Sequence, residues 1–343
     1  MGGTARKFFA EVMLAALAAV CGSAGGGRHV FSVEGKETYL NGKPFLVVGL
    51  RCSNALISDA TTDALIDHLD EYAAYGVNTV SVYFMGSRFG DVKGYREDGT
   101  LDPVYAGRMG RIIEAADARG MVVLVGCLYW STSRAKWDDW GQKQAEAAVA
   151  NTVRWLKERD YRNVFVDVDN EGMARAAKKF DNRLMVIAGK EVDPRCVIAT
   201  NFRGPCPAEA DLGIHHSERP EDRPYIESEA TPANAPGGYW GSYSKRDGYY
   251  NYINIGVYSE AMKADQIRRT DAHLEAGHGY MLASTWLQCA GPYGPNARAG
   301  GYGGEDDPGI RWWLEHIKAR CGPYKAAGAD SALLLESSKR PKR

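Results

Sequence analysis

The sequence predicts a (β/α)8 barrel, also called a TIM barrel. Eight short apolar segments alternate with amphipathic segments along most of the 343 residues. The apolar segments are nearly continuous runs, which is typical of parallel strands covered on both faces. No glycine-rich phosphate-binding loop follows the first of them, so a closed barrel is favoured over an open, doubly wound sheet.

The first elements are a β-hairpin and four strand–helix units. Asn41 and Gly42 supply a turn with positive φ in the hairpin. Pro103 marks a helix start, while Gly76 and Gly120 mark helix ends. The expected strands span 45–52, 77–84, 121–130 and 163–170, and the expected helices span 63–76, 103–120, 143–160 and 174–193.

The second half of the barrel departs from this regular alternation. Its expected strands span 195–202, 210–217, 223–230 and 279–288, and its expected helices span 259–279 and 308–322. Only residues 202–210 and 217–223 separate strands five, six and seven, which is short for a parallel crossover. We therefore expect the fifth and sixth helices to be shortened or lost. The long, aromatic-rich segment 231–258 after strand seven is expected to form an ordered lid.

The ends of the chain predict export. Arg6 and Lys7 precede an apolar run at 12–21, too short for a membrane span, and small residues follow it. We expect a signal peptide at 1–26, a barrel domain at 27–330, a disordered basic tail at 331–343, and a secreted, periplasmic or cell-envelope location. A frayed N-terminal helix and a lipid anchor at Cys21 are the alternatives.

Composition narrows the possible partners. The chain carries 42 basic and 43 acidic residues, so no net field favours nucleic acid or an anionic membrane surface. The six cysteines after the leader fit no zinc spacing and leave both disulfides and free thiols open. We expect a monomer without a cofactor or metal.

Acidic side chains gather where strand four ends. Strand alternation places Asp167, Asp169 and Glu171 on one face and Asn170 on the other. Strand seven likewise runs into Glu227 and Glu229. Because the active site of a TIM barrel lies at the carboxyl ends of its strands, carboxylates from two strands would meet there. Such a pair suits cleavage of glycosidic bonds, and a retaining enzyme needs the two groups about 5 Å apart.

These residues resemble clan A of the glycoside hydrolases, and most closely its family 5 of cellulases and mannanases. The resemblance covers residues 30–320 and rests on "LNGKPFLVVGL", "YGVNTVSVYF", "NVFVDVDNEG", "PYIESE" and "STWLQ". It implies that Glu171 is the acid/base and that Asn170 binds the sugar 2-hydroxyl. The family nucleophile often lies five residues after a proline, which selects Glu229, with Glu227 as the fallback.

The resemblance also implies residues that contact the sugar. Trp286 on strand eight would form the floor of the site, and His215 near the end of strand six would bind substrate, with His216 as the competitor. The family's strand-two arginine is replaced by Ser81, and Arg51 on strand one could substitute for it. The family's strand-three histidine has no counterpart in "GCLYW", and its strand-six tyrosine is replaced by Ser217.

Two aromatic side chains are further candidates for stacking on sugar rings. Trp130 follows strand three and Trp240 lies in the expected lid. Packing of Trp130 and its neighbours Trp137 and Trp140 against the barrel is the alternative.

The functional prediction is an exported retaining β-glycosidase that hydrolyses an oligo- or polysaccharide, with the sugar, the linkage and exo or endo action left open. One alternative is a carbohydrate-binding pseudoenzyme, suggested by the missing arginine and histidine. Another is a metal-dependent barrel enzyme, in which Asp167, Asp169, Glu171 and Glu229 would bind Mg²⁺ through oxygen.

Overall fold

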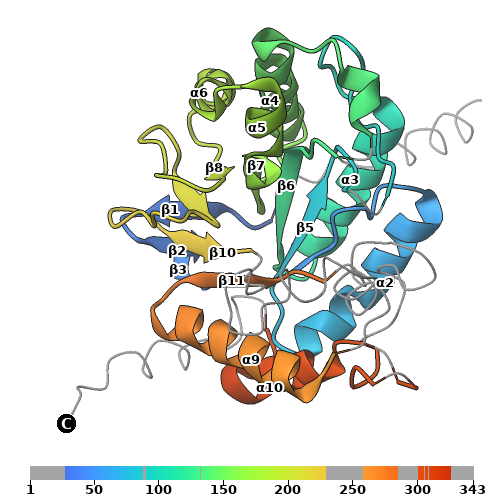
Figure 1. Cartoon of the computed structure of the whole chain (residues 1–343), viewed down its shortest axis with the longest axis vertical. Coiled ribbons are helices and arrows are strands. Elements are labelled where there is room, and N and C mark those ends of the chain that lie inside the picture. Colours follow the sequence, from blue (N-terminus) through green and yellow to red (C-terminus); the bar gives the residue numbers. More distant parts are fainter. Residues whose placement is uncertain are drawn as a thin grey trace, which may run out of the picture.

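A computed structural model describes residues 28–87, 90–131, 133–228, 258–284, 300–304, 306–307 and 309–325. Within these residues, eight parallel strands close into a barrel in the order β10-β11-β4-β5-β6-β7-β8-β9. Helices pack around the outside, and α9 runs alongside β11 (Figure 1). The predicted (β/α)8 barrel is therefore confirmed.

Each barrel strand lies inside one of the predicted apolar segments. The strands are β4 (Val48–Arg51), β5 (Thr79–Tyr83), β6 (Val122–Leu128), β7 (Val164–Asp169), β8 (Ile198–Asn201), β9 (Leu212–Ile214), β10 (Tyr225–Glu227) and β11 (Gly279–Leu282). They are the first to eighth barrel strands in chain order.

The described helices are α2 (Asp59–Ala74), α3 (Pro103–Asp117), α4 (Gln142–Glu158), α5 (Met173–Lys178), α6 (Asn182–Val192), α9 (Glu260–Glu275) and α10 (Arg311–Cys321), with short 3-10 turns η1 (Arg134–Trp137) and η2 (Asn170–Gly172). The helix expected at 174–193 is two helices. Lys179 ends α5 in the left-handed region at φ 63°, and the Asp181 side chain caps α6 by accepting a hydrogen bond from the Arg183 N–H.

A three-stranded antiparallel sheet covers the amino-terminal end of the barrel. It consists of β1 (Phe31–Glu34), β2 (Glu37–Leu40) and β3 (Lys43–Pro44). The Phe31 N–H donates to the carbonyl of Arg162, just before β7, and the Phe31 ring stacks on Phe165 at 5.1 Å. This contact closes the end of the barrel opposite the strand carboxyl ends.

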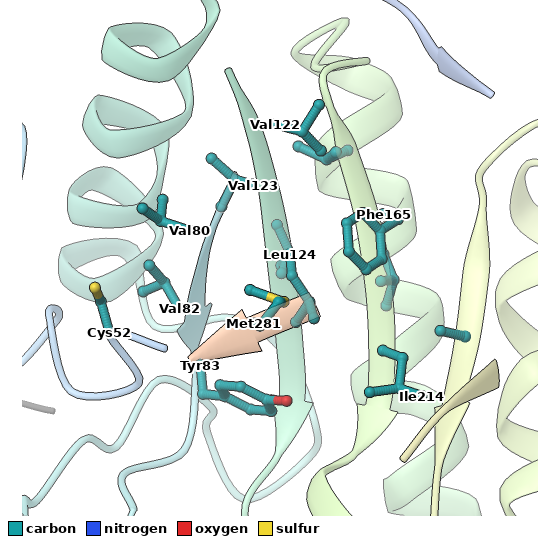
Figure 2. Close-up of a cluster of buried hydrophobic side chains, with 14 of the residues drawn as sticks. Cys52, Val80, Val82, Tyr83, Val122, Val123, Leu124, Phe165, Ile214 and Met281 are labelled. Carbon is teal, nitrogen blue, oxygen red and sulfur yellow. The ribbon is translucent and has the colours of Figure 1, made fainter. Parts of the chain in front are cut away.

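The register of the parallel strands fixes which side chains face the barrel interior. Gly126 pairs with Asp167, Leu124 with Phe165, and Gly49 with Met281, so these residues share the inner face. Figure 2 shows Leu124, Met281 and Phe165 together in the interior. The side chains of the alternate residues in each strand face the helices.

The links between strands five, six and seven contain no helix, as expected from their length. Residues 202–211 and 215–224 form bends, turns and one β-bridge. The Arg223 guanidinium donates to the carbonyl oxygens of Pro207, Ala208 and Ala210 at 3.0, 3.0 and 2.5 Å. One side chain thus satisfies backbone groups that a helix would otherwise satisfy.

The expected leader, the basic tail and nearly all of the expected lid lie outside the described residues. In the part of the chain that the structure describes, Cys52, Cys127, Cys196, Cys206 and Cys321 are free thiols. None of the described helices is both long and apolar enough to cross a membrane.

Candidate active site

The chain leaves β7 through two consecutive left-handed residues. Glu171 has φ 53° and ψ 18°, and Gly172 has φ 64° and ψ 29°. A Cβ at Gly172 would lie 2.6 Å from the Cβ of Phe202, so this position requires glycine for both reasons. Glu171 adopts the same region with a full side chain, a strained conformation that is found preferentially at functional sites.

Asp169 anchors the segment that follows Glu171. Its carboxylate accepts hydrogen bonds from the backbone N–H groups of Ala174 and Arg175, both at 2.9 Å. Burial raises the pKa of Asp169 to about 7, although these donors oppose the change. The bonds tie the first turn of α5 to the end of β7 and so fix the tight turn that carries Glu171.

Asn170 connects Glu171 with Arg51, which projects from β4 into the barrel. The Arg51 Nη2 donates to Asn170 Oδ1 at 2.5 Å, and Asn170 Nδ2 donates to Glu171 Oε1 at 3.1 Å. Arg51 Nη1 also lies 3.9 Å from Glu171 Oε1. Arg51 is 1% exposed, whereas the Glu171 side chain is 31% exposed. A buried cation and an amide therefore orient a carboxyl group that reaches solvent.

A second polar group lies deeper in the barrel. The Tyr83 hydroxyl donates to Asp167 Oδ2 at 2.6 Å, and Asn201 Nδ2 donates to the same oxygen at 2.9 Å. Burial raises the pKa of Asp167 to about 6, and the donors and Arg51 oppose it. Tyr83 reaches Asp167 across β6 because Gly126 lies between them; a Cβ at Gly126 would fall 2.0 Å from the Tyr83 ring.

Several buried polar atoms near this end of the barrel have no hydrogen-bond partner among the described residues. They include the hydroxyl oxygens of Ser81 and Ser228 and the amide oxygen Oδ1 of Asn201. Ser81 pairs in register with Arg51, and Asn201 pairs with Ile214, which places both on the inner face. Buried groups of this kind are usually satisfied by water or ligand.

Glu227, at the end of β10, faces away from this interior. It pairs with Tyr280 of β11, whose ring packs near Trp313 of α10 at 6.3 Å, so both side chains lie on the helix side. This orientation disfavours Glu227 as the nucleophile. Glu229, the preferred nucleophile, lies outside the described residues.

No protein-family model and no curated protein match the sequence. Solved structures do match. A β-mannanase from the blue mussel Mytilus edulis is 11% identical, with a TM-score of 0.53 and coverage of 87% of this chain and 98% of the mannanase. A family 5 glycoside hydrolase from Bacteroides vulgatus is 13% identical, with a TM-score of 0.54 and coverage of 84% and 69%. A β-glucanase from Saccharophagus degradans, solved with cellotetraose, is 13% identical, with a TM-score of 0.50 and coverage of 91% and 94%.

In fold, the chain resembles the family 5 glycoside hydrolases. The expected resemblance is thereby confirmed at the level of the fold. Identities this low say nothing about individual side chains, so the roles of Glu171 and its neighbours depend on the geometry of this chain.

The two histidines after β9 have different surroundings. His216 is buried; its Nδ1 lies 3.0 Å from the Gly204 carbonyl oxygen, and its Nε2 lies 3.0 Å from both the hydroxyl and the carbonyl oxygen of Thr200. Burial lowers the pKa of His216. The His215 side chain is 18% exposed, and its Nδ1 lies 2.5 Å from Glu227 Oε1. Of the two, His215 is the better placed to contact a ligand at the barrel mouth.

The predicted sugar-stacking residues are only partly described. Trp130 is 4% exposed and packs against Trp140 and Phe180, with ring centroids 6.4 and 5.7 Å away. This burial favours the packing interpretation for Trp130 over sugar stacking. Trp240 and Trp286 lie outside the described residues.

The carboxylate oxygens of Asp167 and Asp169, which the metal-dependent alternative would use as ligands, already accept hydrogen bonds from the protein. Asp167 accepts from Tyr83 and Asn201, and Asp169 accepts from backbone N–H groups. Across the described ranges, no group of three or more His, Cys, Asp or Glu side chains is arranged to hold a metal ion. Asp167 and Asp169 are thus hydrogen-bonded within the barrel and to the segment after Glu171, while Glu229, the fourth residue of this alternative, lies outside the described residues.

Sequence reasoning missed Tyr83 and Asn201 as parts of this support. Both end barrel strands, β5 and β8, as Asp169 ends β7. Polar residues at strand ends, together with a glycine inside the apolar segment of β6, were the available signal.

Proposed function

We propose that this chain is an exported retaining β-glycosidase that hydrolyses O-glycosidic bonds of an oligo- or polysaccharide. The observation that supports this most strongly is the arrangement of Glu171: partly exposed at the end of the fourth strand, oriented by Asn170 and Arg51, and carried on a strained turn. The fold shared with solved mannanases and glucanases supports the same reaction class.

Glu171 would serve as the acid/base. In the first step its carboxyl proton passes to the glycosidic oxygen as the bond from that oxygen to the anomeric carbon breaks. In the second step the Glu171 carboxylate takes a proton from the attacking water. The Asn170 amide and the Arg51 guanidinium hold the same oxygen, Oε1, which leaves the orientation of the carboxyl group little freedom.

Glu229 would serve as the nucleophile. Its carboxylate attacks the anomeric carbon to form a glycosyl ester, and water then releases the sugar with retained configuration. The support for Glu229 is its five-residue spacing from Pro224, the spacing that the family resemblance implies for the nucleophile.

The proposed substrates are β-linked mannans or glucans. Two matched structures carry the names β-mannanase and β-glucanase, and the second was solved with cellotetraose.

A panel of β-linked oligosaccharides and aryl β-glycosides tests the proposal. Glu171→Gln and Glu229→Gln should each lower kcat for natural linkages by roughly 10²- to 10⁴-fold while the fold is kept. Aryl glycosides with an activated leaving group need no proton, so Glu171→Gln should retain more of their first-step cleavage. Glu158→Gln, an exposed position at the end of α4, is the matched control.

Near-normal turnover in either variant would reject the assignment. A fluorosugar that forms a stable adduct on Glu229 would establish the covalent step. Cleavage after residue 26 in secreted protein, read by amino-terminal sequencing, would establish export.

A carbohydrate-binding protein without turnover is the second candidate. Ser81 occupies the strand position where the family usually has arginine, and its hydroxyl has no partner among the described residues. This candidate predicts measurable binding of cellotetraose or mannotetraose, no hydrolysis of any panel member, and no fluorosugar adduct.

A further inference from the structure

A buried carboxylate lies in the layer between the barrel and the helices, where side chains are normally apolar. Glu227 ends β10 on the helix side and is 7% exposed. Isolated charges at such depth are strongly disfavoured, so a carboxylate retained there needs close partners.

Both oxygens of Glu227 have such partners. Oε1 lies 2.5 Å from His215 Nδ1, and Oε2 accepts a hydrogen bond from the Tyr225 hydroxyl at 2.9 Å. His273 of α9 is more distant, with its Nε2 3.9 Å from Oε2. The short contact to His215 thus joins Glu227 to the end of a neighbouring strand, β9.

His215 is also held through its backbone. It follows β9 with φ 51°, an uncommon conformation for a residue with a side chain, and its N–H donates to the Ile226 carbonyl at 3.0 Å. Backbone and side chain thus both attach His215 to β10.

The other histidines near Glu227 are poor competitors for its charge. Burial lowers the pKa of His273 to about 4 and also lowers the pKa of His278, and the Nδ1 atoms of these two rings lie 3.3 Å apart. The His273 ring is therefore neutral near pH 7, and its Nε2 is also farther from Glu227 than the His215 Nδ1 is.

Within the described ranges, three further charged or titratable side chains lie around this pair: Arg219, His216 and Tyr225. Arg219, in the link between β9 and β10, lies over the Tyr225 ring at 5.3 Å. His216 lies at the start of the same link, and burial lowers its pKa. Burial and the neighbouring Glu227 raise the pKa of Tyr225, which keeps its hydroxyl protonated as a donor. None of these groups replaces the contact between Glu227 and His215.

We propose that Glu227 is a positioning residue: it fixes the ring of His215 with the proton on Nδ1, so that Nε2 is presented to a hydroxyl group of the bound sugar. A carboxylate commonly orients a functional histidine in this way. The inference rests on the proposed glycosidase function for the role of Nε2. The link between Glu227 and the His215 tautomer stands independently of it.

The tautomer of His215 gives a direct test. Long-range proton–nitrogen NMR spectra at pH 9, with the His215 signal assigned by its loss in His215→Asn, report which ring nitrogen carries the proton. The wild-type protein should give the Nδ1–H form. In Glu227→Gln that preference should weaken, because a carboxamide offers one acceptor for two donors, His215 and Tyr225. An Nε2–H wild-type ring, or an unchanged tautomer in the variant, would overturn the proposal.

Kinetics test the functional half. Glu227→Gln should lower kcat/KM by roughly ten- to a hundred-fold on the best panel substrate. In the His215→Ala background the same change should have little further effect, because Glu227 acts through His215. Additive losses in this double-mutant cycle would contradict the proposed route.

Glu114→Gln is the matched control, because the exposed Glu114 carboxylate also accepts a tyrosine hydroxyl, that of Tyr161. It should leave both the His215 tautomer and the kinetics unchanged. A shifted tautomer in a protein that cleaves no glycoside would reject the proposed function and keep the positioning contact. A shifted tautomer with unchanged kcat/KM in an active enzyme would reject the positioning role alone. If Glu227→Gln does not fold, the wild-type spectrum still tests the tautomer.

Discussion

Replacing Asp167 with asparagine should change how the stability of the barrel depends on pH. Asp167 is fully buried, and burial raises its pKa from 3.8 to about 6. The folded protein therefore holds this proton more tightly than the unfolded chain. The contribution of Asp167 to the free energy of unfolding is greatest below pH 4 and is lost as the pH rises through about 6.

The size of the effect follows from the shift. A difference of about 2 pKa units corresponds to about 3 kcal/mol, most of which is lost between pH 4 and pH 7. Asparagine does not titrate, so the variant does not lose this contribution. The free energy of unfolding of Asp167→Asn minus that of the wild type should therefore rise by roughly 2 to 3 kcal/mol between pH 4 and pH 7. The two proteins should also differ in stability by a constant amount at all pH values. In the wild type the Asp169 N–H donates to Asp167 Oδ1 at 3.2 Å, and in the variant the NH₂ group of the asparagine can face this donor instead of an acceptor.

Urea unfolding at several pH values between 4 and 8, followed by tryptophan fluorescence, measures the difference between the two proteins. Only its change with pH matters, because the offset from the lost acceptor does not depend on pH. Asp139→Asn, at an exposed position of the loop after β6, should give a difference that is nearly flat with pH. A flat difference for Asp167→Asn would mean that Tyr83, Asn201 and Arg51 outweigh burial.

Three further substitutions test the support of the site. Arg51→Lys keeps the charge but loses the fork that reaches both Asn170 and Glu171, and kcat/KM for the best glycoside should fall about ten-fold or more. Gly172→Ala should lower the free energy of unfolding in urea by about 1 to 3 kcal/mol, because φ is 64° and Phe202 obstructs the new Cβ; a loss under about 0.5 kcal/mol would contradict this. Arg223→Met removes the donor to three carbonyl groups and should cost about 2 to 3 kcal/mol by the same measurement.

The barrel itself was predictable because its strands are buried on both faces. Apolar runs such as 121–130 and 163–170 are typical of parallel strands covered on both faces, and the short links around β9 correctly predicted missing helices. The break between α5 and α6 was missed. It depends on Lys179 adopting a left-handed conformation and on Asp181 capping the next helix, features that the helical pattern of 174–193 conceals.

The sequence predicted correctly only those parts of the site whose residues all lie on one strand. Alternation along strand four suffices to group Asp167, Asp169 and Glu171, whereas the direction of Glu227 depends on the register of β10 against β11. A strand of three residues carries too little pattern to reveal which face is buried against helices. Contacts that cross the barrel, such as Tyr83 to Asp167, depend on closure and are not contained in any local pattern.

The three carboxyl groups at the end of β7 differ in function because they differ in depth. Asp167 is the deepest and its charge is shared with Tyr83 and Asn201 inside the barrel, while Asp169 uses its oxygens to hold the start of α5. Glu171 alone of the three is substantially exposed, and it is the one whose backbone is strained. A strained residue persists only if its surroundings determine its conformation. The two buried carboxylates therefore support the conformation of Glu171. Asp167 accepts the Asp169 N–H before the turn, and Asp169 accepts two N–H groups after it, so that Glu171 keeps one orientation at the mouth of the barrel.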